Sequence, residues 1–165
     1  MTVSLRRIAS LPNGFDGLRA DAEVDGFRHM RRLAAEFETT REMFHAVLAA
    51  FIAGGLAGIG GITDEPQPTS APTWRMRRLY VHRGFRRRGV ARAIAAALLA
   101  EAANNVRMVT VHAGNDSAAR FWEAIGFEQA TCKAWTHQTT VFPATSGNSS
   151  KPISRLPNGR KRPNS

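Results

Sequence analysis

A short basic loop between a predicted strand and a predicted helix is the segment best suited to bind a ligand. It reads Leu79-Tyr-Val-His-Arg-Gly-Phe-Arg-Arg-Arg-Gly-Val-Ala-Arg92 and opens into an alanine-rich run that favours a helix. The unpaired amides at a helix start, together with the positive end of the helix dipole, bind phosphate or pyrophosphate. Gly89 and Ala91 leave room for phosphate oxygens to approach the backbone. The loop alone fits equally well a glycine that merely starts a helix beside solvated arginines.

The strand that leads into this loop breaks its own alternation. Trp74 and Met76 take even positions, whereas Leu79 and Val81 take odd ones. One extra residue that bulges out of the strand ladder explains such a change of face. An irregular, partly exposed strand over residues 74–81 explains it equally well.

Before this strand, the pattern predicts an edge strand, two short helices and a hairpin. Residues 1–11 suit the edge strand, and residues 27–37 carry apolar side chains at helical spacing. Residues 46–62 carry no charge and approach the length of a membrane span. Their glycines and few large side chains instead predict two buried strands joined by a turn at Gly54-Gly55.

After the alanine-rich helix, the pattern predicts further strands on either side of one more helix. Residues 106–111 read as a strand that is buried on both faces. The next helix has its start capped by Asn115 or Asp116 and ends at Gly126. Residues 127–142 offer one or two more strands.

Length and composition indicate a single basic domain. A chain of 165 residues suits one domain, predicted over residues 1–145, and residues 146–165 predict a disordered basic tail because they cannot bury a core. A net charge of +10 favours a polyanionic partner, either a phosphate-bearing cofactor or nucleic acid. Cys132 is the only cysteine, which excludes an intrachain disulfide and favours a reducing compartment. Because the first residues also lack the apolar core of a signal peptide, we expect a cytoplasmic location.

Two motifs in the right order make the sequence resemble the GCN5-related N-acetyltransferase (GNAT) superfamily. The phosphate-loop pattern Gln/Arg-x-x-Gly-x-Gly/Ala is matched by Arg86-Arg-Arg-Gly-Val-Ala91, and the preceding Leu-x-Val strand by Leu79-Tyr80-Val81. A later element, an asparagine followed by a helix with an aromatic pair and a Gly-Phe end, is matched by Asn115, Phe121-Trp122 and Gly126-Phe127. The resemblance covers roughly residues 75–127.

The resemblance implies a fold, a reaction and a cofactor site. The fold is a twisted mixed sheet of six to seven strands with about four flanking helices, splayed between the fourth and fifth strands and bulged in the fourth. The reaction is transfer of an acetyl group from acetyl-CoA to a primary amine of a small acceptor, without a metal, which would make the chain an N-acyltransferase. The implied cofactor-binding set is Leu79, Tyr80, Val81, Arg86, Arg87, Arg88, Gly89, Val90, Ala91, Arg92, Asn115 and Trp122.

The catalytic groups follow the family pattern less closely. Many members use a tyrosine to protonate the departing thiolate where this chain has Trp122, and an indole N–H is no usable acid. Tyr80 is the only tyrosine, so a tyrosine acid can only be Tyr80. Among bases, His112 lies two residues after Thr110 on the same predicted strand face and has a suitable ordinary pKa. Glu65, in the loop after the hairpin, is a second candidate, although a loop acid is usually solvated.

Three functions of different classes remain open from the sequence. The favoured one is the N-acetyltransferase described above. An acyl-CoA-binding protein without turnover is suggested by Trp122, where many family members have the acid, and by Thr110, on a strand where many have a glutamate base. A nucleic-acid-binding protein is suggested by the eight arginines between Arg75 and Arg92 and by the tail, but few aromatic residues accompany them for base stacking. We therefore expect nucleic acid at most as a nonspecific contact of the tail, no membrane, and leave a homodimer open.

Overall fold

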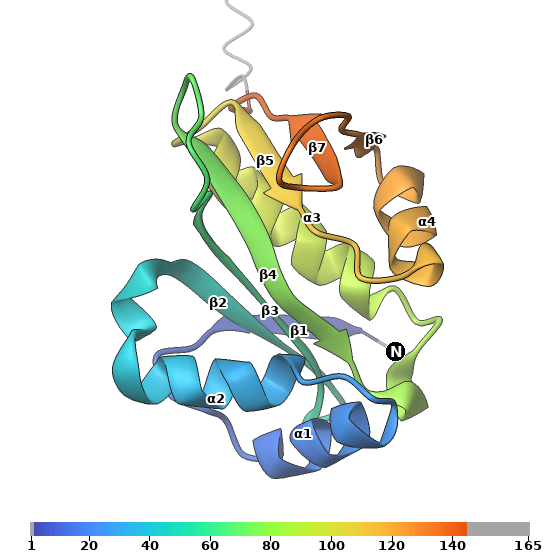
Figure 1. Ribbon diagram of the computed structural model, residues 1–165. Helices are drawn as coiled ribbons and strands as arrows, with labels where there is room; N and C mark the ends of the chain where they lie inside the picture. Colours follow the sequence, from blue (N-terminus) through green and yellow to red (C-terminus); the bar gives the residue numbers. More distant parts are fainter. Residues whose placement is uncertain (1, 145–165) are drawn as a thin grey trace, which may run out of the picture.

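A computed structural model describes residues 2–144, which form one seven-stranded sheet with helices on both faces (Figure 1). The predicted tail lies outside the described residues. The elements are β1 (Val3–Arg7), α1 (Phe15–Val24), α2 (His29–Thr39), β2 (Phe44–Ile52), β3 (Gly55–Asp64), β4 (Thr73–Val81), α3 (Val90–Ala103), β5 (Met108–Val111), α4 (Asp116–Ala124), β6 (Glu128–Gln129) and β7 (His137–Thr140). Short 3-10 turns occupy Arg41–Met43 and Arg83–Phe85. The sheet order is β1-β2-β3-β4-β5-β7-β6, with every pair antiparallel except β4–β5. This confirms the predicted mixed sheet.

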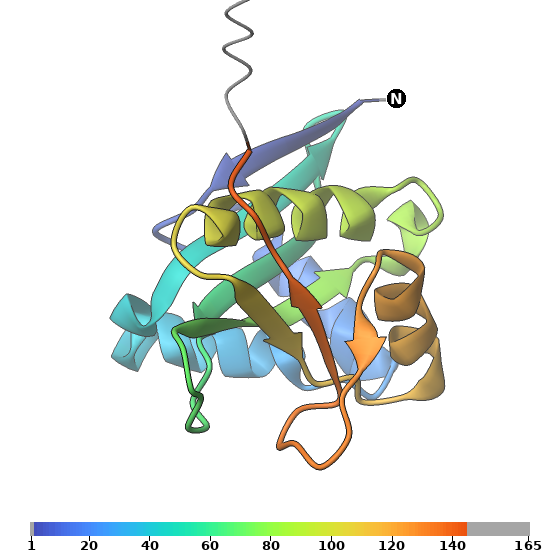
Figure 2. The same cartoon turned by 90° about the horizontal axis from the view of Figure 1, so that it is seen from above.

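Helix α3 lies on one face of the sheet and helices α1 and α2 lie on the other, as Figure 2 shows from above. An apolar core lies on each face. On one face α3 buries Ile94 and Leu98 against the strands, and on the other α1 and α2 bury side chains such as Leu18, Met30 and Leu33. The glycines of β3 allow α3 to lie close to the sheet. A Cβ atom at Gly60 would come within 2.7 Å of the Ile94 side chain. The sheet therefore holds both helical layers in fixed positions around β4.

The uncharged stretch over residues 46–62 forms the β2–β3 hairpin, as predicted. Its turn is Ala53-Gly54, one residue earlier than expected, and both residues have positive φ (49° and 81°). Two such residues match the twist of the flanking strands in a two-residue hairpin. Among the helices of residues 2–144, none is long and apolar enough to cross a membrane.

Strand β4 parts from β5 after a short parallel ladder. The pairs run only from Thr73–Met108 to Arg75–Thr110, so the rest of β4 has no strand on that edge. On its other edge β4 pairs with β3, and the register shifts between Arg77–Gly61 and Tyr80–Ile59, with Arg78 at φ 58°. This shift confirms the predicted bulge. The predicted splay between the fourth and fifth strands is likewise present.

Candidate active site

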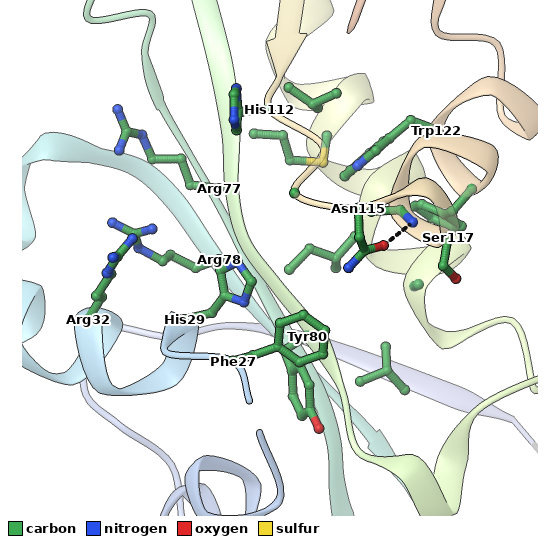
Figure 3. Close-up of a pocket in the computed structure, with 18 of the residues that line it drawn as sticks. Phe27, His29, Arg32, Arg77, Arg78, Tyr80, His112, Asn115, Ser117 and Trp122 are labelled. Atoms are coloured by element: carbon green, nitrogen blue, oxygen red, sulfur yellow. Dashed lines mark hydrogen bonds between the residues drawn. The ribbon is translucent and has the colours of Figure 1, made fainter. Parts of the chain in front are cut away.

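A cleft of about 890 Å³ opens where β4 and β5 separate. Its floor is β4 from Arg75 to Val81, and its two sides come from the start of α2 and from the segment between β5 and α4. Figure 3 shows His29, Arg32, Arg77 and Arg78 on the α2 side of β4, and Asn115, Ser117 and Trp122 on the other. The cleft therefore has two unlike halves, one rich in arginine and one lined by α4.

The phosphate loop lies between β4 and α3 and is shaped by two residues with positive φ. Gly89, directly before α3, has φ 75°, and Arg87 has φ 64°. A Cβ atom at Gly89 would meet no protein atom within 4 Å, so the space in front of this backbone is open. The side chains of Arg87, Arg88 and Arg92 are exposed. The loop thus offers open backbone at a helix start, which is the arrangement that binds phosphate groups.

The structure brings part of the predicted cofactor set into the cleft itself. Those that line it are Leu79, Tyr80, Val81, Arg86, Ala91, Asn115 and Trp122. Of the others, Arg87, Arg88, Gly89 and Arg92 lie exposed in the loop and the first turn of α3, whereas Val90 is buried in the core. The Arg86 side chain is also exposed, but its guanidinium pairs with Asp25 and lies over the Tyr80 ring.

Asn115 and Trp122 form the α4 side of the cleft. The Asn115 side-chain oxygen accepts a hydrogen bond from the Ala118 N–H (2.8 Å) and so caps α4, which leaves the amide NH₂ for a ligand (Figure 3). Trp122 is only 6% exposed and meets the rings of Phe121 and Phe127 edge-on, with ring centroids 4.9 and 5.0 Å away. Its indole is therefore held rigidly by aromatic neighbours while it borders the cleft.

Tyr80 does not suit the proton-donor role predicted for it. Its hydroxyl donates to Asp21 (2.7 Å) and lies 3.2 Å from a carboxylate oxygen of Asp25. Burial, the hydrogen bond to Asp21 and the two negative charges raise the pKa of Tyr80 above its ordinary value. A tyrosine whose proton is held by carboxylates is a weaker acid than a free one. Tyr80 instead joins β4 to α1.

Replacing Tyr80 with phenylalanine is expected to lower the free energy of unfolding and to leave turnover largely unchanged. Burial alone would raise the pKa of Asp21, but hydrogen bonds from Tyr80 and Arg83 lower it from 3.8 to about 2. Removing one bond to a buried carboxylate costs about 1.5–3 kcal/mol of unfolding free energy at pH 7. The folded-state pKa of Asp21 is depressed, so its contribution is present above pH 4 and is lost as the pH falls toward 2. The difference between the two proteins in urea unfolding should therefore shrink from pH 7 to pH 3.

The same variant tests the role of Tyr80 in turnover. Tyr80→Phe should retain most activity once an acceptor is known, because the Tyr80 hydroxyl is already held by Asp21 and Asp25. A loss of more than a hundredfold in turnover, with normal folding and normal acetyl-CoA binding, would restore Tyr80 as the acid.

Glu65 is buried, whereas an acid in a loop is expected to be solvated. Its side chain is fully buried and accepts two hydrogen bonds from Arg75, both 2.6 Å long, and one from Thr110 (3.0 Å). Its backbone N–H also donates to Thr73 (2.8 Å). Glu65 does not line the cleft, and its oxygens already have partners. This geometry argues against Glu65 as a base and gives it a role in joining β4 to β5.

Two histidines line the cleft. His112 follows β5 and is exposed, and Thr110, predicted on the same face, is buried beside Glu65. His29, at the start of α2, is one that the sequence did not single out. Its Nδ1 is buried without a hydrogen-bond partner among residues 2–144, and burial and the charges of Arg78 and Arg32 lower its pKa. These surroundings favour the neutral form of His29, whose unpaired ring nitrogen makes it a candidate base.

A metal centre is not evident in the described part of the chain. No three His, Cys, Asp or Glu side chains there are close enough together to hold a metal ion.

Comparison with known proteins agrees with this geometry. The sequence pattern of the Acetyltransferase (GNAT) family matches residues 11–127. No curated protein matches the chain. Among solved structures, a candidate acetyltransferase from Exiguobacterium sp. 255-15 is 23% identical with a TM-score of 0.70 (85% of this chain, 94% of that one). Ard1 from Thermoplasma volcanium is 19% identical with a TM-score of 0.63 (86% and 99%), and a protein solved as the KacTA–DNA complex is 15% identical with a TM-score of 0.64 (84% and 93%). The structural similarity shows a common fold, and the family match shows that this chain belongs to the GNAT acetyltransferase family.

Proposed function

We propose that this protein transfers an acetyl group from acetyl-CoA to a primary amine of a small-molecule acceptor, with both substrates bound at once. The observation that carries the proposal is one continuous cleft along the unpaired edge of β4, which begins beside an open phosphate-binding loop. A long thiol cofactor with a pyrophosphate needs such a loop at one end and an exposed strand edge along its arm. The family match supports the same reaction class.

In this proposal, backbone groups bind most of acetyl-CoA. The amides from Arg87 to Arg92 hold the pyrophosphate, and main-chain groups of Leu79 and Val81 pair with the amides of the pantetheine arm. The Asn115 amide contributes a further hydrogen bond to the arm. Trp122 is the apolar side wall next to the thioester. Backbone donors explain why the loop tolerates arginines at positions whose side chains point to solvent.

The chemistry needs little beyond correct placement of the two substrates. The amine nitrogen attacks the thioester carbonyl, a C–N bond forms, and the C–S bond breaks to release a thiolate. The amine proton passes to a base, for which His29 and His112 are the cleft-lining candidates. The thiolate takes a proton from water, because a thiol with an ordinary pKa near 8.5 is largely protonated at neutral pH. Positioning of the reactants supplies much of the rate.

Thermal melts with acetyl-CoA test the proposal. If the dissociation constant is about 10 µM, 1 mM acetyl-CoA stabilises the folded protein by about 2.7 kcal/mol, which raises the melting temperature by roughly 5–10 °C. ATP at the same concentration is the control for a general polyanion effect and should raise it much less. A melting temperature that acetyl-CoA leaves unchanged would contradict the proposal.

An acyl-CoA-binding protein without turnover is a second candidate, favoured by the Tyr80 hydroxyl being held by carboxylates. It shares the melting shift but releases no free thiol with any amine. Measuring thiol release across an amine collection separates the two functions.

A further inference from the structure

The half of the cleft that faces α2 carries more positive charge than its own carboxylates can balance. Four arginines line it, Arg32 on α2 and Arg75, Arg77 and Arg78 on β4, and we name them the arginine wall. Figure 3 shows Arg32, Arg77 and Arg78. Over residues 2–144, none of the side chains that line the cleft is an aspartate or a glutamate.

Two arginines of the wall form ion pairs with carboxylates that do not line the cleft. Arg75 makes two hydrogen bonds of 2.6 Å to the buried Glu65, and Arg78 makes two to Glu36, one of them 3.0 Å long. These pairs hold both guanidinium groups in place. Neither has charge left to attract a ligand strongly.

The other two arginines have no carboxylate partner in the described chain. Arg77 donates through Nε to the Thr63 hydroxyl (3.1 Å), and no hydrogen bond is made by its two terminal nitrogens within residues 2–144. Arg32 is exposed on α2, and its side chain has no ion-pair partner in the same range. The wall thus carries an excess of two positive charges, one of them half-buried.

Arg77 is not an ordinary surface arginine. Burial, with the adjacent charges of Arg75 and Arg78, lowers its pKa below the ordinary value. A partly desolvated cation without a carboxylate partner is unfavourable unless an anion joins it. An anion that binds here would remove that cost.

We propose that the acceptor amine carries a carboxylate or phosphate group and that Arg77 and Arg32 bind this group; the inference rests on the proposed acetyl transfer. A simple alkylammonium ion is repelled by the wall, because it brings only positive charge. The planar guanidinium fork matches both carboxylate and phosphate oxygens. The same positive charges lower the pKa of a bound ammonium group, so more of the acceptor is in the neutral form that attacks the thioester.

A binding experiment on the CoA-saturated protein tests the site without turnover. Inorganic phosphate and propionate are titrated at constant ionic strength, and the midpoint of the melting shift is compared among variants. Losing one guanidinium contact to an anion is expected to weaken binding about 10- to 100-fold. Arg77→Gln and Arg32→Gln should both show this loss. Arg28→Gln removes the same charge from the residue before α2, outside the cleft, and should behave like the unaltered protein.

A turnover experiment uses four amines that share one aminoethyl group. They are phosphoethanolamine, β-alanine, ethanolamine and ethylenediamine, with a phosphate, a carboxylate, a neutral group and a second amine respectively. For the unaltered protein we expect kcat/KM to be at least about tenfold higher for one of the two anionic amines than for ethanolamine. Which anionic amine leads distinguishes phosphate from carboxylate. Arg77→Gln should reduce that ratio about tenfold. Arg32→Gln should reduce it as well, and because Arg32 is exposed and has no ion-pair partner in the described chain, its loss should not disturb folding. The second variant therefore tests the site even if Arg77→Gln folds poorly.

Several outcomes would overturn the inference. One is the absence of any anion effect that depends on Arg77 or Arg32 in a protein that shows the full acetyl-CoA melting shift. Another is a kcat/KM that is highest for ethylenediamine. Tighter binding of a DNA duplex than of phosphate, lost in the same two variants, would show the wall to be a surface for nucleic acid. A missing acetyl-CoA shift would instead count against the proposed function, so the two failures are distinguishable.

Discussion

Replacing Gly89 with valine is expected to reduce acetyl-CoA affinity by at least about 100-fold. Gly89 has φ 75°, a conformation that β-branched residues avoid, and its Cβ would extend into the open space in front of the phosphate loop. Two or more charge-assisted hydrogen bonds to phosphate would be lost, each worth about 1.5–3 kcal/mol. Isothermal titration with acetyl-CoA measures the affinity directly.

Gly126→Val is the matched control for this substitution. Gly126 also lies next to a helix end, has φ 106°, and would likewise place a Cβ where no protein atom lies within 4 Å. Both variants should lose about 1–3 kcal/mol of stability through backbone strain. Only Gly89→Val should lose binding. Normal acetyl-CoA binding by a folded Gly89→Val protein would show that the phosphates bind elsewhere.

Trp122 has the second large expected effect, because it combines a packing role with a place beside the cleft. Trp122→Ala should cost about 3–5 kcal/mol of unfolding free energy, since it removes a buried indole from between Phe121 and Phe127. Trp122→Phe should retain most stability and turnover, because both residues are apolar walls and neither is an acid. Urea unfolding and thiol release measure the two effects separately.

Trp122→Tyr adds a proton donor at the position where many family members have one. If protonation of the thiolate limits the rate, this variant should raise turnover by up to about 100-fold. A Trp122→Phe protein that folds and binds cofactor normally, yet loses more than a hundredfold in turnover, would contradict the expectation that the indole acts only as an apolar wall. The indole N–H would then take part in the reaction.

The features predicted well from the sequence are those that depend on residues close together in the chain. The helix after the basic loop and the Asn115 cap are local patterns, and the bulge at Arg78 was visible as a change of phase between Met76 and Leu79. The predicted hairpin turn was one residue late. Glycine favours positive φ, so the sequence suggested Gly54-Gly55, whereas the turn uses Ala53 and Gly54. Local backbone patterns therefore account for the elements that form the loop and the α4 side of the cleft.

The acceptor side was predicted poorly because its contacts join residues far apart in the chain. The bond from Tyr80 to Asp21 spans 59 positions, and the bond from Thr110 to Glu65 spans 45. Residue type alone made Tyr80 and Glu65 resemble an acid and a base, whereas their hydrogen-bond partners favour structural roles. His29 belonged to no motif. The signal that could have indicated it is the three-residue spacing from Arg32, which places both beside the buried stripe of α2 on one helix face.

The buried carboxylate of Glu65 affects how mutagenesis of this enzyme family member is interpreted. It bonds β4 through Arg75 and β5 through Thr110, next to the point where those strands separate. Its removal would leave a buried guanidinium unpaired at the vertex of the cleft and change the spacing between its two halves. We expect an enzyme so altered to lose activity as one deprived of a general base would, even if Glu65 transfers no proton. Inactivity after substitution of Glu65 would therefore report on cleft geometry, and the proton acceptor has to be identified by how the rate titrates with pH.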